Sequence, residues 1–312
     1  MVTTPKIPAQ FLARTHIQGL SGRVLELPAS AAHADRLPAL LIYGHHSSLE
    51  RMYSLAQAVN EHAPVVLPDM PGFGGMPSLT TIGKKPNTDG LADYLAAFVR
   101  QRFPDGQRFV VGGMSLGFVV VVRMLQRHPE LLPQVAHLFS LVGFVHYNDF
   151  NIAPRKRRFF VRVARTMARR PTAKAFDNLI LRKPFIATTY NLRARSHPKM
   201  KGYTWTERQN LIDFEVILWK TNEVRTYFTT MAEMLNIDLT AQPLPLPVEH
   251  VAVSTDQYFD NHKVVEHLKQ MFTSVHIHYA NMPNHAPTVV EDVADARQMI
   301  PNSLWHIFAN KS

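Results

Sequence analysis

The sequence predicts an α/β fold, in which helices cover both faces of a mostly parallel sheet and a block of helices is inserted into the chain. Two observations predict it. Short apolar runs typical of buried strands alternate with helical segments up to about residue 145, and the alternation resumes near residue 246. From residue 148 to residue 245 the strand signals are absent and helical ones dominate. We therefore expect a sheet domain made of residues 1–147 and 246–312, with 148–245 as a helical cap or lid.

Size and composition limit the class of protein. With 312 residues, the chain can bury one large core and still carry an insertion. It has no cysteine, which excludes disulfides, thiolate catalysis and cysteine-ligated zinc and fits a cytoplasmic protein. Met1–Pro8 lacks the apolar core of a secretory signal, and no run of about 18 apolar residues predicts a membrane span. We expect no cofactor and no metal ion.

The predicted elements follow one another along the chain. The apolar runs that predict strands are Arg23–Leu27, Ala39–Tyr43, Val65–Leu67, Phe109–Val111, Leu138–Phe144, Val248–Val253 and Val275–Tyr279. The segments that predict helices are Ser47–Glu61, Leu91–Val99, Val119–Leu125, Arg155–Arg170, Thr204–Lys220, Glu223–Leu235, Val264–Met271 and 289–308. Ser47 and Glu50 have the spacing of a capping box, and the alternating prolines from Pro243 to Pro247 predict a stiff, extended linker.

A Gly-x-Ser-x-Gly motif joins a predicted strand to the helix that follows it. Gly113-Met-Ser-Leu-Gly117 places Ser115 on the sharp turn of a nucleophile elbow. Such a turn strains the serine backbone, and a side chain at 113 or 117 would clash with the neighbouring strand or helix. The turn also puts Ser115 at a helix N-terminus, where backbone N–H groups stabilise developing negative charge. The alternatives are a glycine-rich turn that carries a serine by chance, or a phosphate loop, which lacks its usual Gly-Lys-Ser/Thr here.

These residues, in their order along the chain, resemble the α/β-hydrolase superfamily with a cap domain. The resemblance rests on Gly113–Gly117, on Asp69-Met-Pro-Gly-Phe-Gly74, and on the order serine, acid, histidine. Three positions depart from the family pattern. Tyr43-Gly44 stands in place of the usual His-Gly, the acid turn Val253–Asp256 lacks a glycine, and Phe118 occupies a position where a small residue is common.

A serine hydroxyl is a weak nucleophile and needs an adjacent base. His285 is the candidate, because it lies in a polar loop after the last predicted strand. The base in turn needs an acid, and the resemblance places Asp256 in that role. Two alternatives stay open: Asp260, whose other role is to cap a helix, and Asp149, which follows the preceding strand, where some relatives carry the acid.

Backbone groups complete the predicted site. We expect the N–H groups of Leu116 and His45 to bind the oxyanion, since both flank the nucleophile in this fold. Asp69 is interpreted as structural, because an Asx-type turn would organise the loop that it begins. The pair His276 and His278 has the spacing of two metal ligands, but the sequence suggests no third ligand.

The sequence therefore predicts a serine hydrolase that cleaves a carboxylic ester through an acyl-enzyme on Ser115. The Met- and Phe-containing cap favours a substrate with an apolar acyl or alcohol group. A lactonase, a thioesterase or a carbon–carbon bond hydrolase is the alternative on the same fold, as is a non-catalytic member that binds a small ligand or a protein. Haloalkane dehalogenases and epoxide hydrolases are disfavoured, because those relatives have Asp at this position. The oligomeric state stays open.

The segment Arg155–Arg170 carries eight basic residues and no acidic one. On a helix, Phe159, Val163 and Met167 share one face, and a second face carries arginines: Arg158, Arg162, Arg165 and Arg169. This segment could contact an anionic membrane surface or an acidic partner, or it could be a solvated face. The net charge of +10 allows the same partners. Nucleic acid is not expected, because few aromatic residues interleave the basic ones.

Overall fold

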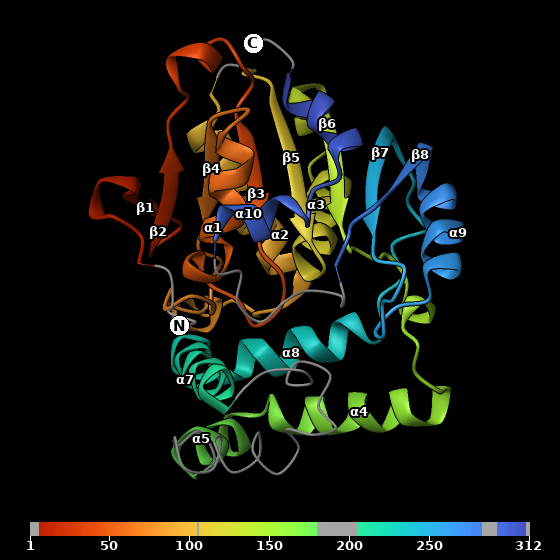
Figure 1. The fold of residues 1–312 in the computed structure, drawn as a ribbon. Coiled ribbons are helices and arrows are strands. Elements are labelled where there is room, and N and C mark those ends of the chain that lie inside the picture. Colours follow the sequence, from red (N-terminus) through yellow and green to blue (C-terminus); the bar gives the residue numbers. More distant parts are fainter. Residues whose placement is uncertain (1–5, 105, 180–204, 283–291, 310–312) are drawn as a thin grey trace.

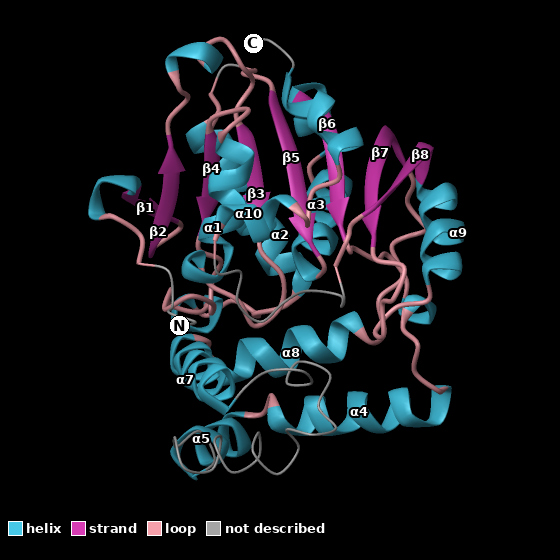
Figure 2. Cartoon of the chain, in the orientation of Figure 1, coloured by secondary structure: helices cyan, strands magenta, loops and turns pink. Residues whose placement is uncertain are grey.

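The computed structural model describes residues 6–104, 106–179, 205–282 and 292–309. Within them, one sheet has the strand order β1-β2-β4-β3-β5-β6-β7-β8. The strands are β1 (Leu12–Ile17), β2 (Leu20–Leu27), β3 (Ala39–Ile42), β4 (Val65–Pro68), β5 (Phe109–Met114), β6 (Val135–Leu141), β7 (Leu244–Ala252) and β8 (Phe272–Tyr279). β2 pairs antiparallel with β1 and β4, and the other neighbours are parallel (Figure 1; Figure 2). The predicted, mostly parallel sheet is confirmed.

Helices cover both faces of this sheet. α1 (Leu49–Asn60) and α10 (Val293–Arg297) pack together on one face, and α2 (Thr88–Arg102) and α3 (Leu116–Arg127) on the other (Figure 1). α9 (Asn261–Met271) packs against β8 at the edge. Short 3-10 helices connect these elements: η1 (Ala9–Phe11), η2 (Ala31–His33), η3 (Leu79–Ile82), η4 (Pro129–Gln134), η5 (Tyr147–Asp149) and η6 (Asn302–Ala309). All residues of β3, β4 and β5 are buried, as expected of parallel strands covered on both sides.

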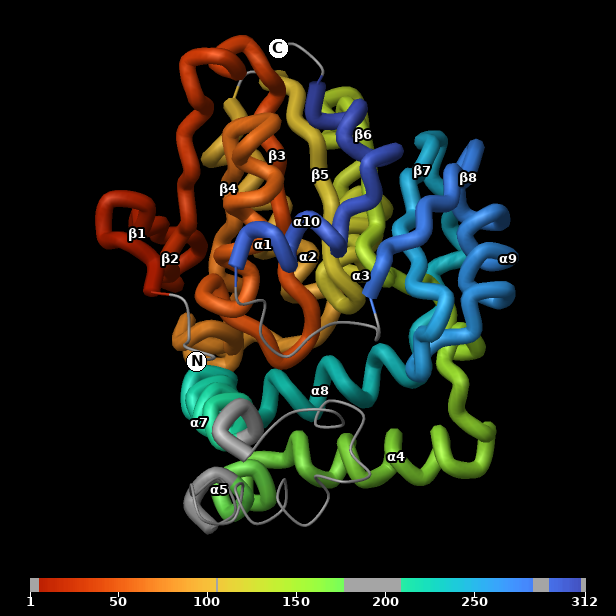
Figure 3. Tube along the Cα trace, viewed as in Figure 1, coloured from red at the N-terminus to blue at the C-terminus, as the bar shows by residue number. Residues whose placement is uncertain are grey.

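Among the described residues, four helices lie beyond the carboxyl ends of the parallel strands, and we call them the helical layer. They are α4 (Pro154–Met167), α5 (Arg170–Leu179), α7 (Trp205–Thr221) and α8 (Val224–Met234). The chain leaves the sheet after β6 to enter this layer and returns from α8 to β7 (Figure 3). The layer buries a hydrophobic cluster of its own, made of Ala164, Ala173, Leu211, Ile212, Phe214, Val216, Leu218, Val224, Phe228 and Ala232. None of the described helices has the length and apolar character needed to cross a bilayer.

The first part of the sheet differs from the sequence prediction in two places. The prediction lacks β1, which forms a hairpin with β2 through Gln18 and Gly19, whose φ angles of 51° and 85° suit a type I′ turn. α1 begins at Leu49, one residue later than a capping box on Ser47 requires, and its N-cap residue makes no side-chain capping bond. Glu50 instead forms an ion pair with an arginine of β2, so a long-range contact replaces the predicted local one.

The second half of the sheet also differs at its strand ends. β6 ends at Leu141, before the predicted end of the strand. The reason is that Val142 has a φ of 45°, which lies outside the β region that a strand requires. β7 begins at Leu244, so the proline segment predicted as a linker is already part of the sheet. The pairing of β7 with β8 is irregular between Leu244 and Pro247, because proline has no N–H to donate.

Candidate functional site

Ser115 lies on the turn between β5 and α3. Its φ of 50° and ψ of −115° strain a non-glycine residue, and its N–H donates to the carbonyl of Leu141 at 2.9 Å. A Cβ on Gly113 would lie 2.2 Å from the backbone of Gly117. A Cβ on Gly117 would lie 2.2 Å from the carbonyl oxygen of Ile42. The strained turn and the need for both glycines are therefore as the sequence predicts.

The side chain of Ser115 points into a cavity of about 420 Å³ between the sheet and the helical layer. Ser115 is the N-cap residue of α3, yet its side chain makes no capping hydrogen bond. Phe118, one turn into α3, does not line the cavity. Its side chain is fully buried in the core, with its ring centroid 6.1 Å from that of Phe272. The large residue at this position therefore does not narrow the cavity.

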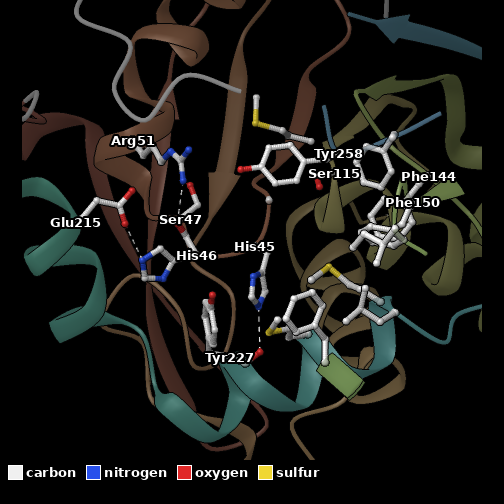
Figure 4. A pocket seen from close by; sticks show the side chains of 18 of the residues that line it. His45, His46, Ser47, Arg51, Ser115, Phe144, Phe150, Glu215, Tyr227 and Tyr258 are labelled. Carbon is white, nitrogen blue, oxygen red and sulfur yellow. Dashed lines mark hydrogen bonds and ion pairs between the residues drawn. The ribbon is translucent and has the colours of Figure 1, made fainter. Parts of the chain in front are cut away.

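Both apolar and polar side chains line the cavity. The apolar side chains that line it include Phe144, Phe150, Ile152, Phe160, Met231, Met234, Leu235 and Phe259. The polar side chains that line it include His45, His46, Ser47, Arg51 and Glu215. Figure 4 shows Glu215, Arg51 and His46 on the opposite side of the cavity from Phe144 and Phe150. A bound molecule would meet an apolar wall on one side and hydrogen-bonding groups on the other.

The backbone beside Ser115 offers hydrogen-bond donors. Leu116 is the first residue of α3, so its N–H has no acceptor within the helix. The loop after β3 lies against the elbow, since a Cβ on Gly44 would be 3.1 Å from the carbonyl oxygen of Met114 and 3.5 Å from the Cβ of Ser115. His45 follows directly and lines the cavity. Both predicted oxyanion residues thus lie next to Ser115.

The helical layer holds the loop that carries His45 and His46. Nε2 of His45 donates to the carbonyl of Tyr227 at 3.0 Å (Figure 4). The amide nitrogen of Asn222 donates to Nδ1 of His46 at 3.2 Å, so neutral His46 carries its proton on Nε2. That nitrogen lies 3.2 Å from a carboxylate oxygen of the fully buried Glu215. Two helices of the layer therefore set the conformation of this loop.

Three residues that hold this loop are not predicted from the sequence: Glu215, Asn222 and Tyr227. A signal exists for Glu215, because it lies within the otherwise apolar run Phe214–Leu218 and a buried charge requires partners. No such signal exists for Asn222, since a polar residue just after a helix is ordinary. The contact of Tyr227 is made by its backbone carbonyl, which any residue could supply. The roles of Asn222 and Tyr227 therefore depend on the packing of the helical layer against the sheet.

Asp256 follows β7 on a turn that the carboxylate itself stabilises. Its Oδ1 accepts hydrogen bonds from the N–H groups of Tyr258 at 2.8 Å and Phe259 at 3.2 Å. Tyr258 and Phe259 both line the cavity. The structure thus brings this turn to the same cavity as Ser115. The predicted base, His285, lies outside the described residues.

The two alternative acids have partners of their own and do not line the cavity. Asp260 caps α9 by accepting from the N–H groups of its first turn, and it pairs with Lys263 at 3.2 Å. Asp149 is fully buried, and one of its oxygens accepts from the backbone N–H groups of the two residues just before η5. Its other oxygen contacts Nδ1 of His267 on α9 at 2.5 Å. Both carboxylates are therefore accounted for by local structure.

Asp69 organises the loop after β4. Its oxygens contact Nε of Arg23 at 2.8 Å and the hydroxyl of Tyr43 at 3.3 Å, and a Cβ on Gly74 would lie 2.1 Å from Oδ1. The Tyr43 hydroxyl also accepts from the N–H of Met70 at 2.7 Å. Burial raises the pKa of Asp69 to about 7, against the opposing effect of Arg23. The tyrosine that replaces the usual histidine of the family thus ties this loop to β3.

One cluster of the described residues has the composition of a metal site. The ligand atoms of His146, Asp149 and His267 lie within 4.8 Å of one another. Nδ1 of His146, however, accepts from the N–H of Asn148 at 3.1 Å, and both oxygens of Asp149 already accept hydrogen bonds. Hydrogen bonding that caps η5 therefore accounts for this cluster.

The His-x-His pair lies on β8 and faces β7. Glu249 on β7 accepts from Nδ1 of His276 at 2.8 Å and from Nε2 of His278 at 2.7 Å. This carboxylate is a third group that the sequence does not suggest, because pairing between strands brings it there. Its contacts link the two strands by hydrogen bonds.

Known proteins match most of the chain. The family model of the alpha/beta hydrolase fold matches residues 37–286. The chain belongs to this α/β-hydrolase family. Among curated proteins, the biotin biosynthesis bifunctional protein BioHC of Cellvibrio japonicus is 30% identical over 123 residues. The match covers 39% of this α/β-hydrolase and only 22% of that protein.

Solved structures share the fold of this α/β-hydrolase. An N-acyl homoserine lactonase superposes with a TM-score of 0.65 at 15% identity, covering 96% of this chain and 98% of that one. A thermophilic esterase from Thermogutta terrifontis superposes with a TM-score of 0.57 at 13% identity, covering 95% of each chain. At such identities the likeness shows the fold alone.

Proposed function

We propose that this α/β-hydrolase cleaves carboxylic esters through an acyl-enzyme on Ser115. The observation that carries the proposal is the strained backbone of Ser115 at the start of α3, with its side chain in the cavity. Backbone strain of this kind destabilises the folded protein. It is found at functional sites, where a reactive side chain must be held in position for the substrate. The position at a helix N-terminus also favours an oxyanion beside the hydroxyl.

In the proposed reaction, His285 takes the proton from Oγ of Ser115 as this oxygen attacks the ester carbonyl carbon. The tetrahedral oxyanion accepts hydrogen bonds from the N–H groups of Leu116 and His45, each contributing about 3 kcal/mol. The bond to the alcohol oxygen then breaks, and His285 gives this oxygen the proton. Water attacks the acyl-enzyme by the same steps and releases the acid. Asp256 orients His285 and stabilises its protonated form.

The substrate we propose is a small-molecule ester with an apolar acyl or alcohol group. The wall of phenylalanine and methionine side chains supports this proposal, since an extended apolar chain can bury its surface there. We further propose that residues 148–245 act as the cap of the site. The support is that Phe160, Trp219 and Met231, all from the helical layer, line the cavity that Ser115 faces.

A covalent probe tests the proposal directly. A fluorophosphonate should label the protein at Ser115, and p-nitrophenyl esters of rising acyl length should be cleaved. Ser115→Ala should abolish both, whereas Ser274→Ala, a change at an exposed serine of β8, should alter neither. Lactones and thioesters assayed beside the esters identify the preferred leaving group. Absence of labelling, together with ligand binding unchanged in Ser115→Ala, would instead indicate a non-catalytic binding protein.

A further inference from the structure

The outward face of α4 combines arginines with exposed apolar side chains. The helix turns Val161 and Ala164 inward, where they are 5% and 1% exposed. Phe159 and Val163 point outward and are 60% and 41% exposed. The outward face also carries these exposed cations: Arg155, Lys156, Arg158, Arg162 and Arg165. Phe159 is therefore flanked by cations on a surface directed to solvent.

The charge of the chain is concentrated in this part of the sequence. Residues 151–204 contain 15 Lys and Arg against a single Asp, which leaves 19 basic and 23 acidic residues elsewhere. Residues 151–204 are thus strongly positive, while the rest of the chain is slightly negative. The ion pairs found among the described residues join other elements and do not include a cation of α4. Within the described parts of the chain, no carboxylate pairs with these cations, although Lys156 lies 5.7 Å from the ring centroid of Phe160.

We propose that the outward face of α4 docks on an anionic phospholipid bilayer. A helix that lies in a membrane surface needs cations for the headgroups and apolar side chains that enter the interface. Arg158 and Arg162 supply the first, and Phe159 and Val163 supply the second. An acidic protein or a nucleic acid would use the cations but would leave a protruding phenylalanine without a defined role.

Docking by this face would bring the cavity next to the membrane. Phe160 follows Phe159 in sequence and lines the cavity, as does Ile152 just before the helix. The helical layer would then lie between the bilayer and the cavity. A molecule dissolved in the bilayer would therefore reach the cavity by crossing this layer. Bilayer binding itself does not depend on the proposed hydrolase activity, so either can fail without the other.

Co-sedimentation with vesicles tests the docking. The protein should bind vesicles of phosphatidylcholine mixed with phosphatidylglycerol, and it should bind pure phosphatidylcholine vesicles far less. Salt should weaken the binding. The double variant Arg158→Glu, Arg162→Glu should bind more than about tenfold more weakly, since each cation contributes separately. Phe159→Ala should also weaken binding, whereas Phe159→Trp should retain it, because tryptophan suits the interface.

The matched control is the double variant Lys85→Glu, Lys269→Glu, which makes the same change of charge at exposed sites outside the helical layer. It should bind vesicles like the parent. Equal binding by the α4 variant and this control would overturn the proposal, as would equal binding to neutral and anionic vesicles. Binding to an acidic protein or to duplex DNA without binding to anionic vesicles would also overturn it. Thermal unfolding of each variant shows that the fold is kept.

Discussion

Asn222 and His46 are joined by a hydrogen bond that connects the helical layer to the loop beside Ser115. The amide nitrogen of Asn222 donates to Nδ1 of His46 at 3.2 Å, while its amide oxygen accepts from the N–H of Gly74 at 2.9 Å. One buried side chain therefore ties together the loops after β3 and β4. Through His46 it also places a ring nitrogen 3.2 Å from a carboxylate oxygen of Glu215. The layer is thus part of the structure that positions the predicted oxyanion donor, His45.

The first prediction concerns this bridge. Asn222→Ala leaves the N–H of Gly74 and Nδ1 of His46 without their partner, and Asn222 is only 4% exposed. We expect a loss of about 2 kcal/mol in the free energy of unfolding and a fall in kcat larger than any rise in KM, because the loop is misplaced. Urea unfolding and ester kinetics measure both. Asn236→Ala, at an exposed asparagine, should change neither, and unchanged kinetics in the first variant would refute the positioning role.

The second prediction concerns the elbow. Gly117→Ala places a Cβ 2.2 Å from the carbonyl oxygen of Ile42, a backbone atom that cannot move aside without displacing β3. We expect a loss of more than about 3 kcal/mol in the free energy of unfolding, or no folded protein. The control is Gly106→Ala, where φ is 76° but the added Cβ has open space. Only the backbone preference is lost there, at a cost of about 1 kcal/mol. Urea denaturation of both variants tests the difference, and equal losses would contradict it.

The parts of the fold that the sequence predicts are those whose signal is local. β3, β4 and β5 are buried on both faces and therefore appear as continuous apolar runs. β1 is half exposed and six residues long, so its apolar pattern is too weak to distinguish it from a loop. The capping box at Ser47 is predicted but not formed. Glu50 instead forms an ion pair with Arg23, a residue that is distant in the sequence.

The same distinction holds for the site and for α4. The elbow is local, since the strain at Ser115 and the clashes at its glycines follow from five consecutive residues. The link from Glu215 to His46 joins residues 169 positions apart and depends on how the helical layer packs. For α4, the sequence separates the apolar residues from the arginines. Packing then decides which side turns inward, and it buries Val161 rather than Phe159.

The third prediction follows from the carboxyl group of Asp69. Its folded pKa is about 7, and an unfolded aspartate titrates near about 3.9. Between about pH 4 and about pH 7, the folded protein therefore holds a proton that the unfolded chain has released. The contribution of Asp69 to the free energy of unfolding falls as pH rises through this range, by up to about 1.4 kcal/mol per pH unit. Asp69→Asn should remove this slope from a series of urea titrations. An unchanged slope would show that Asp69 is ionised in the folded protein.

The fourth prediction has the opposite sign. His250 is 1% exposed, Nδ1 lies 3.0 Å from the hydroxyl of Ser140, and burial lowers its pKa to about 4. Since an unfolded histidine titrates near about 6.5, the unfolded chain binds a proton between these values that the folded protein does not. The contribution of His250 to the free energy of unfolding therefore rises with pH from about 4 to about 6.5 and offsets that of Asp69. His250→Gln should make the pH profile fall more steeply, the reverse of Asp69→Asn. His16→Gln, at an exposed histidine, should leave the profile unchanged.

The last prediction distinguishes the three candidate acids. Asp256→Asn should lower kcat for a p-nitrophenyl ester by about 10⁴-fold, because the amide no longer stabilises the correct tautomer and the protonated form of His285. Asp260→Asn should keep kcat close to that of the parent, since asparagine also caps a helix and this carboxylate pairs with Lys263. Asp149→Asn should act mainly on stability, because the buried oxygens of Asp149 accept from backbone N–H groups and contact His267. Kinetics combined with urea unfolding separate these outcomes. A fully active Asp256→Asn beside an inactive but stably folded Asp149→Asn would transfer the role to Asp149.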